Sequence, residues 1–216
     1  MSISISHVRK PDAALVRYVE AEIIPRYATF DKAHQVSHVQ TVISQSLVLA
    51  AYYPELNVDM VYVIAAYHDT GLVEGREFHH IASGRILLAD QTLRKWFSEA
   101  DLQVMKEAVE DHRASSDHEP RSLYGRIVAE ADRQIEVDVV LRRTVQYGLK
   151  HTPELDKEGH YQRMCEHLHE KYAEGGYLKL WIPQSQNATE LERLRQVIRD
   201  EEQLRAAFER IYQEET

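Results

Sequence analysis

The sequence has little of what covalent or sheet-based folds need. It contains one cysteine, Cys165, among 216 residues. An intrachain disulfide needs two cysteines and a thiolate metal cluster needs several, so both are excluded. Glycine (8) and proline (6) are scarce, and long stretches of alternating polar and apolar residues, which would predict strands, are missing. These absences favour an all-α fold.

Two further absences concern the partners of the chain. No apolar run approaches the roughly 18 residues of a membrane span, and the N-terminal MSISISHVRKPDAALV lacks a basic stretch followed by an apolar one. We therefore expect no signal peptide, no membrane partner and a cytoplasmic location. The formal net charge is −9 without a block of Lys and Arg. Because such a surface repels phosphate backbones, a nucleic acid partner is not expected.

The residues that are present predict a helical core with a helical extension. Hydrophobic residues make up 44% of the chain and charged residues 28%, an ordinary globular balance. Apolar periodicity predicts helices near residues 11–28, 35–53, 60–68, 79–90, 99–112, 123–148, 161–174 and 188–213. A polar linker, KHTPELDKEGH, follows Gly148. The sequence thus predicts a core over residues 1–150 and an extension over 151–216 that packs on the core or on a partner.

Four polar residues lie inside otherwise apolar helical segments: His38, the adjacent pair His68 and Asp69, and Asp132. Charged side chains rarely enter a core without partners, because losing water is costly. One divalent cation would satisfy all four. Two imidazoles and two carboxylates suit Mn, Fe, Co, Zn or Mg. Helical neighbours point about 100° apart, so His68 and Asp69 converge only if their helix ends there, and Gly71 predicts that end.

The order H…HD…D resembles the signature of the HD-domain metal-dependent phosphohydrolases. The flanking segments HVQTVISQSLVLA, AAYHDTG and YGRIVAEADRQIE resemble that family as well, over about residues 30–148. The resemblance implies an all-α HD-domain helical bundle that holds its metal between the core helices. Carried onto this sequence, it implies that the metal ligands are His38, His68, Asp69 and Asp132.

Further histidines resemble those of small stand-alone HD hydrolases. His80 and His112 stand where these proteins often carry site-facing histidines, which hold a second metal in bimetallic relatives. Those relatives also use an adjacent pair of histidines late in the motif, where this sequence reads HRASSDH. We therefore expect one ion rather than two. Five other histidines are expected at the surface: His79, His118, His160, His167 and His169.

Several cationic residues are candidates for binding substrate. Arg113 and Arg121 flank the loop before the Asp132 helix, and forked guanidinium groups suit phosphate oxygens; a solvated or ion-paired arginine is the alternative. Lys32 is a weaker candidate of the same kind. His34 lies one helical turn before His38, where it could support the ligand, contact substrate or cap the helix.

The resemblance implies hydrolysis of a phosphoester or phosphoanhydride in a nucleotide or other small phosphorylated metabolite. A metal-bound water would attack, Asp69 would orient or deprotonate it, and His80 or His112 would transfer protons. Two alternatives stay open: a sensor that binds nucleotide or metal without turnover, and a di-iron oxygenase of the HD type. The stripe Tyr177, Leu178, Leu180 and Trp181 is expected to dock on the core, to form a lid, or to join two copies in a homodimer.

Overall fold

The computed structural model describes residues 8–31, 34–116 and 118–216. The chain forms two compact units. Unit 1 runs up to Arg133 and includes Trp181–Ser185, and unit 2 consists of Gln134–Leu180 and Gln186–Thr216. Throughout the described residues the regular elements are helices, without a strand, so the all-α prediction is confirmed. The structure divides the chain after Arg133, earlier than the boundary near residue 150 that the sequence suggests.

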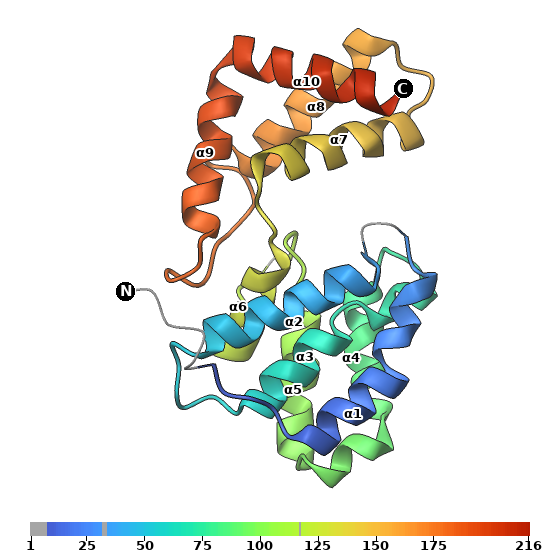
Figure 1. Cartoon of the computed structure of the whole chain (residues 1–216), viewed down its shortest axis with the longest axis vertical. Coiled ribbons are helices and arrows are strands. Elements are labelled where there is room, and N and C mark those ends of the chain that lie inside the picture. The colour runs from blue at the N-terminus through green and yellow to red at the C-terminus, as the bar shows by residue number, and fades with distance from the viewer. Residues whose placement is uncertain (1–7, 32–33, 117) are drawn as a thin grey trace. The chain divides into compact units, whose positions relative to one another are not determined.

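Unit 1 is built around helix α3, Val58–Tyr67. Its other elements are α1 (Ala13–Glu22), η2 (Ile24–Thr29), α2 (Val36–Ala50), η4 (Thr70–Glu74), α4 (His79–Ala89), η5 (Gln91–Lys95), α5 (Glu99–Glu110) and α6 (Leu123–Asp132). Every residue from Met60 to Tyr67 is buried, and α3 contacts α1, α2, α4, α5 and α6 (Figure 1). A helix that is apolar on all sides must be central, because it has no face to give to water.

Helix α3 ends where the sequence predicts, and Gly71 has a second role there. The backbone passes from His68 to Asp69 (φ −110°, ψ 5°) and enters the short 3-10 helix η4. The Gly71 N–H donates to the Ser83 hydroxyl at 2.7 Å. A Cβ at Gly71 would overlap the His79 carbonyl oxygen and lie 2.5 Å from the Ser83 nitrogen. Glycine therefore allows η4 to approach the first turns of α4.

The predicted helix over residues 123–148 is wrong, because the structure breaks it in two. Helix α6 ends at Asp132, Arg133 leaves the helical region with ψ of 72°, and α7 begins at Val137. No glycine or proline marks this break. Its cause is tertiary, since the apolar face of α6 is buried in the core of unit 1 whereas α7 contacts α8, α9 and α10.

Unit 2 contains α7 (Val137–His151), α8 (Lys157–Tyr172), α9 (Asn187–Arg199) and α10 (Glu201–Glu215). The single helix predicted over 188–213 is two helices, because the Asp200 carboxylate caps α10 by accepting the Gln203 N–H at 2.9 Å. His160 is buried, so its predicted surface position is wrong.

The segment Trp181–Ser185 belongs to unit 1 although it follows most of unit 2 in the sequence. The fully buried Glu130 carboxylate accepts the N–H groups of Trp181 and Ile182 at 2.6 and 3.3 Å, and also the Ser185 hydroxyl. Ile182 is 2% exposed and joins the core of unit 1. Trp181 therefore packs on the core of unit 1, whereas Tyr177, Leu178 and Leu180, the other members of the predicted stripe, belong to unit 2.

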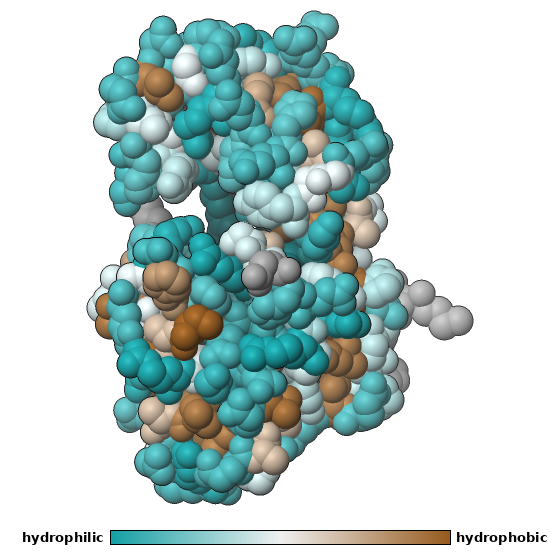
Figure 2. All heavy atoms as spheres, turned by 180° about the vertical axis from the view of Figure 1, so that it is seen from behind, coloured by the Kyte–Doolittle hydropathy of each residue, from teal (hydrophilic) through white to brown (hydrophobic). Residues whose placement is uncertain are grey.

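The face in Figure 2 is mostly hydrophilic, with apolar side chains in small scattered groups. Among the helices of the described residues, none has the length and apolar character needed to cross a membrane.

Candidate metal centre

The four ligands predicted from the sequence come together at three helices of unit 1. His38 lies near the start of α2, His68 and Asp69 at the end of α3, and Asp132 at the end of α6. The His38 Nε2 atom lies 3.2 Å from His68 Nε2, 3.5 Å from Asp69 Oδ2 and 3.3 Å from Asp132 Oδ1. His68 Nε2 is 3.1 Å from Asp69 Oδ2. We call these four residues the first ligand group.

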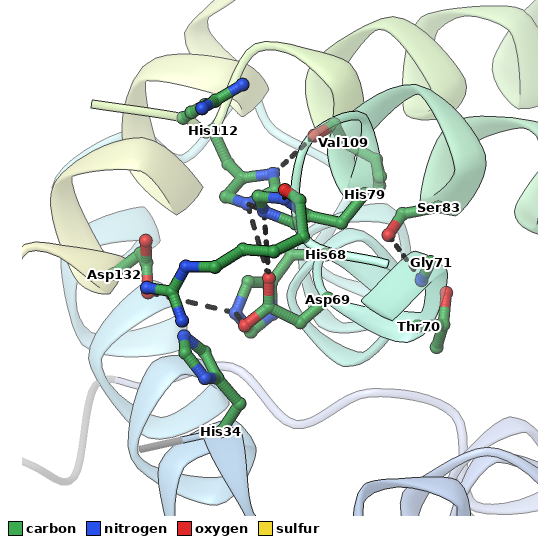
Figure 3. A network of polar contacts seen from close by, with 12 residues as sticks. His34, His68, Asp69, Thr70, Gly71, His79, Ser83, Val109, His112 and Asp132 are labelled. Atoms are coloured by element: carbon green, nitrogen blue, oxygen red, sulfur yellow. Dashed lines mark hydrogen bonds and ion pairs between the residues drawn. The ribbon is translucent and has the colours of Figure 1, made fainter. Parts of the chain in front are cut away.

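A second ligand group shares Asp69 with the first. The other carboxylate oxygen, Asp69 Oδ1, lies 3.3 Å from His79 Nε2 and 3.4 Å from His112 Nε2, and the two Nε2 atoms are 3.2 Å apart. Figure 3 shows Asp69 in the middle, with His79 and His112 on one side and Asp132 and His34 on the other. Each oxygen of one carboxylate thus faces its own set of imidazoles.

Backbone carbonyls orient the imidazoles of the second ligand group toward Asp69. The Nδ1 atoms of His79 and His112 lie 2.8 and 2.6 Å from the carbonyl oxygens of Arg76 and Val109. A carbonyl only accepts, so each Nδ1 donates and each neutral ring keeps a lone pair on Nε2. With both rings neutral, two such lone pairs and a carboxylate oxygen face one another, and a positive charge between them would stabilise this arrangement. The donor set therefore fits a divalent cation.

The same orientation holds in the first ligand group. His68 Nδ1 donates to the Ala65 carbonyl oxygen at 2.8 Å, which turns Nε2 toward His38. Burial acts to lower the pKa of His38, but hydrogen bonds to Asp132 and Asp69 raise it to about 9. Without a metal, His38 therefore carries a proton at neutral pH, and a bound cation would replace that proton.

The carboxylates of the centre are anionic despite their surroundings. Burial acts to raise the pKa of Asp69, but the neighbouring imidazoles, His68 foremost, hold it well below its usual range. Burial opposes ionisation of Asp132 as well, yet the hydrogen bond from His38 keeps its pKa low. Burial and the nearby His112 lower the pKa of His79 to about 4, so His79 is neutral and ready to bind a metal.

Of the His79–His80 pair, His79 is the one that faces Asp69, although the sequence predicts His80 at the site. His79, predicted at the surface, faces Asp69 with 12% of its side chain exposed, whereas His80 lines a separate cavity. His79 is the first residue of α4. Successive helical residues point about 100° apart. The sequence predicts the start of this helix only to within one residue, which is too imprecise to decide whether His79 or His80 faces Asp69. His112 is buried and faces the centre.

Tyr27 supports the centre and was not identified from the sequence. Its buried hydroxyl accepts the Asp69 N–H at 3.2 Å and donates to the Ala66 carbonyl oxygen at 2.9 Å. The last turn of a helix leaves carbonyl groups without intrahelical partners. Tyr27 satisfies one of them and at the same time holds the backbone of Asp69.

The residues predicted to bind substrate differ in how strongly other groups of the protein already hold them. Lys32 lies outside the described residues. His34 Nδ1 is 2.7 Å from Asp31 Oδ1, and its ring lies 5.7 Å from that of His38. Arg113 donates to the Glu77 carbonyl oxygen at 2.8 Å. Arg121 is occupied, because its guanidinium bonds Asp111 at 2.8 Å and Glu110 at 2.9 Å.

A cavity of about 700 Å³ lies beside the second ligand group. Its walls come from the start of α4 and from the end of α5 with the loop that follows. The lining residues are His80, Ile81, Glu110, Arg113, Ser115, Ser116, His118, Glu119 and Arg121.

One comparison with known proteins gave a match, and it covers this site. The model of the family described as HD domain matches residues 36–134, which contain both ligand groups. Neither the curated proteins nor the solved structures gave a match.

Proposed function

Residues 36–134 match the family described as HD domain, and from that premise we propose that the chain is a metal-dependent hydrolase that cleaves a phosphoester or phosphoanhydride. The substrate would be a nucleotide or another small phosphorylated metabolite. The observation that carries the proposal is the shared carboxylate, Asp69, between two groups of metal-binding side chains. Two such groups are the arrangement in which paired ions clamp a phosphoryl group in known two-metal enzymes.

We propose two ions, where the sequence alone led us to expect one. His38, His68, Asp69 and Asp132 would hold the first, and Asp69, His79 and His112 the second. Bound divalent ions would lower the pKa of a water ligand and polarise a phosphoryl oxygen. The sequence lacks the adjacent histidine pair that bimetallic relatives use late in the motif, and for that reason it predicts one ion. The Nε2 atom of His79 supplies a further ligand for a second ion.

We assign the remaining steps, which are holding the ions, orienting the attacking water and contacting the leaving group, to different residues of the chain. Both oxygens of Asp69 face imidazoles, so we assign it to holding ions. With 26% of its side chain exposed, Asp132 is the most exposed of the proposed ligands. We infer that water and substrate enter the centre on the side of Asp132. We therefore transfer the role of orienting the attacking water from Asp69 to Asp132. His80 and Arg113 line the adjacent cavity, where they can contact the departing part of the substrate.

The shared carboxylate also favours a second candidate, oxidation at a di-iron pair. This alternative needs more ligands than the sequence analysis could identify, and His79 adds one. Metal content and a visible absorption band separate it from hydrolysis, since Mn, Mg or Zn ions with turnover of a phosphate ester exclude it. A cytoplasmic location and a homodimer stay predictions.

The experiment combines elemental analysis with a screen of nucleotides and phosphomonoesters in the presence of Mn, Co, Mg and Ni. We expect two ions per chain and turnover of a defined substrate. His79→Ala should lose one ion and most activity. The matched control is His80→Ala, which changes the adjacent imidazole and should keep both ions. Full metal content in His79→Ala would refute the second ligand group, and bound metal without any turnover would indicate a sensor.

A further inference from the structure

Arg76 connects two sides of the metal centre. Its carbonyl oxygen accepts the Nδ1–H of His79 at 2.8 Å, so its backbone is fixed to a member of the second ligand group. Gly75, just before it, has φ of +108°, a conformation that disfavours other residues. The direction in which Arg76 leaves the end of η4 therefore depends on a glycine.

The guanidinium of Arg76 reaches toward the opposite side. Its Nη1 atom lies 3.5 Å from Asp31 Oδ2, and the other oxygen of Asp31 lies 2.7 Å from His34 Nδ1. The His34 ring is 5.7 Å from the ring of His38, a member of the first ligand group. Arg76, Asp31 and His34 thus form a chain of contacts from the loop between η4 and α4 to the residues just before α2. In Figure 3, His34 lies across Asp69 from His79.

Arg76 is held more weakly than Arg121, so an incoming anion can bind it more easily. The Arg76 side chain is 67% exposed and that of Asp31 is 45% exposed. The distance between Arg76 Nη1 and Asp31 Oδ2, 3.5 Å, is long for an ion pair. Such exposed pairs are weak. Arg121, by contrast, is held by two carboxylates and the Glu107 carbonyl oxygen. A dianionic phosphoryl group offers a guanidinium a better fork of acceptors than a single carboxylate oxygen does.

We propose that Arg76 binds the phosphoryl group of the substrate at the metal centre and exchanges Asp31 for it when substrate arrives. This inference rests on the proposed hydrolysis and names a substrate-binding residue that the family resemblance does not supply. Asp31 competes with the substrate for Arg76 and keeps His34 in place after Arg76 has left. Removing the arginine and removing its competitor should therefore have opposite effects on phosphate affinity.

Inorganic phosphate is the probe, titrated into the full-length Mn-loaded protein by calorimetry. Arg76→Ala should weaken phosphate binding by at least about tenfold, the loss of one charge-assisted contact pair. Arg76→Lys should lie between Arg76→Ala and the unmodified protein. Asp31→Asn should tighten binding severalfold. The matched control is Arg85→Ala, since Arg85 is 63% exposed and ion-paired with Glu74; its phosphate affinity should not change.

Two results would overturn the proposal: Arg76→Ala that binds phosphate as tightly as the unmodified protein, or Arg76→Ala that loses Mn. The second result would mean that the side chain supports the metal ligands instead of the substrate. Because phosphate binding is measured without turnover, the outcome is independent of whether any ester is hydrolysed. Phosphate binding that depends on Arg76 in a protein without hydrolytic activity would support Arg76 while refuting the proposed function.

Discussion

Both units carry ion pairs at the surface, but among the described residues buried carboxylates occur in unit 1 and not in unit 2. In unit 1, Asp69 and Glu130 are at most 3% exposed, and their oxygens are held by imidazoles or by backbone N–H groups. In unit 2, Arg199 and Arg205 pair with glutamates at the surface. A buried charge with specific partners determines where chain segments lie, and losing a partner is costly. An exposed pair contributes little. The buried charges of unit 1 therefore determine where its chain segments lie, whereas the surface pairs of unit 2 do not.

The largest predicted effect follows from removing the shared carboxylate. Asp69→Ala takes a ligand from both groups at once, so bound metal should fall below one ion per chain. Activity should fall by more than about 100-fold, which exceeds the usual cost of losing an outer-shell partner. Elemental analysis and circular dichroism check this, the latter to show that the helices persist. Full metal content would mean that Asp69 is not a ligand.

Glu130→Ala should produce the next largest effect. It leaves the buried N–H groups of Trp181 and Ile182 without an acceptor, which should destabilise unit 1 by about 3 kcal/mol. Both tryptophans of the sequence, Trp96 and Trp181, lie in unit 1, so their fluorescence follows its unfolding in urea. An unchanged midpoint would mean that the segment Trp181–Ser185 contributes nothing to unit 1.

Asp90 offers a smaller effect with a defined pH dependence. Burial acts to raise its pKa, but the hydroxyls of Tyr18 and Tyr67, each 2.5 Å from Oδ2, lower it. A lowered folded-state pKa gives stability that is present above the unfolded value of about 3.9 and is lost as pH falls through the folded value. Asp90→Asn should therefore cost about 1 kcal/mol at pH 7. The difference in urea midpoint should shrink toward pH 3, and a constant difference would contradict the assignment.

The smallest effect is expected in unit 2. Arg199 pairs with Glu174 and Glu192 at the surface, where water and salt screen the charges. Arg199→Gln should leave the urea midpoint, followed by circular dichroism, unchanged within error at physiological salt. A loss as large as that of Glu130→Ala would remove the contrast between the two units.

The sequence was most informative where local pattern decides the structure. The helical class and the first ligand group follow from residue type, order and an apolar context, and the structure brings His38, His68, Asp69 and Asp132 together as the motif implies. The end of α3 was visible because Gly71 marks it. These features depend on residues that are close in the sequence or belong to a recognisable motif.

Other features depend on contacts that no local pattern reveals. The choice between His79 and His80 depends on the exact start of α4. The break between α6 and α7 has no glycine or proline to mark it. The role of Glu130 requires partners 51 and 52 residues away, and Tyr27 meets Asp69 across 42 residues. In each case the tertiary structure decides what the sequence leaves open.

The discontinuous make-up of unit 1 has a consequence for its synthesis. Its core includes Ile182, which is translated only after Gln134–Leu180, a stretch that belongs to unit 2. Chains emerge from the ribosome N-terminus first, and domains generally fold as units. The unit that contains both candidate ligand groups therefore cannot complete its core while the ribosome is still translating α7 and α8, although all residues of these groups have already been made. A nascent chain arrested before Ile182 would carry every ligand and still lack the finished unit.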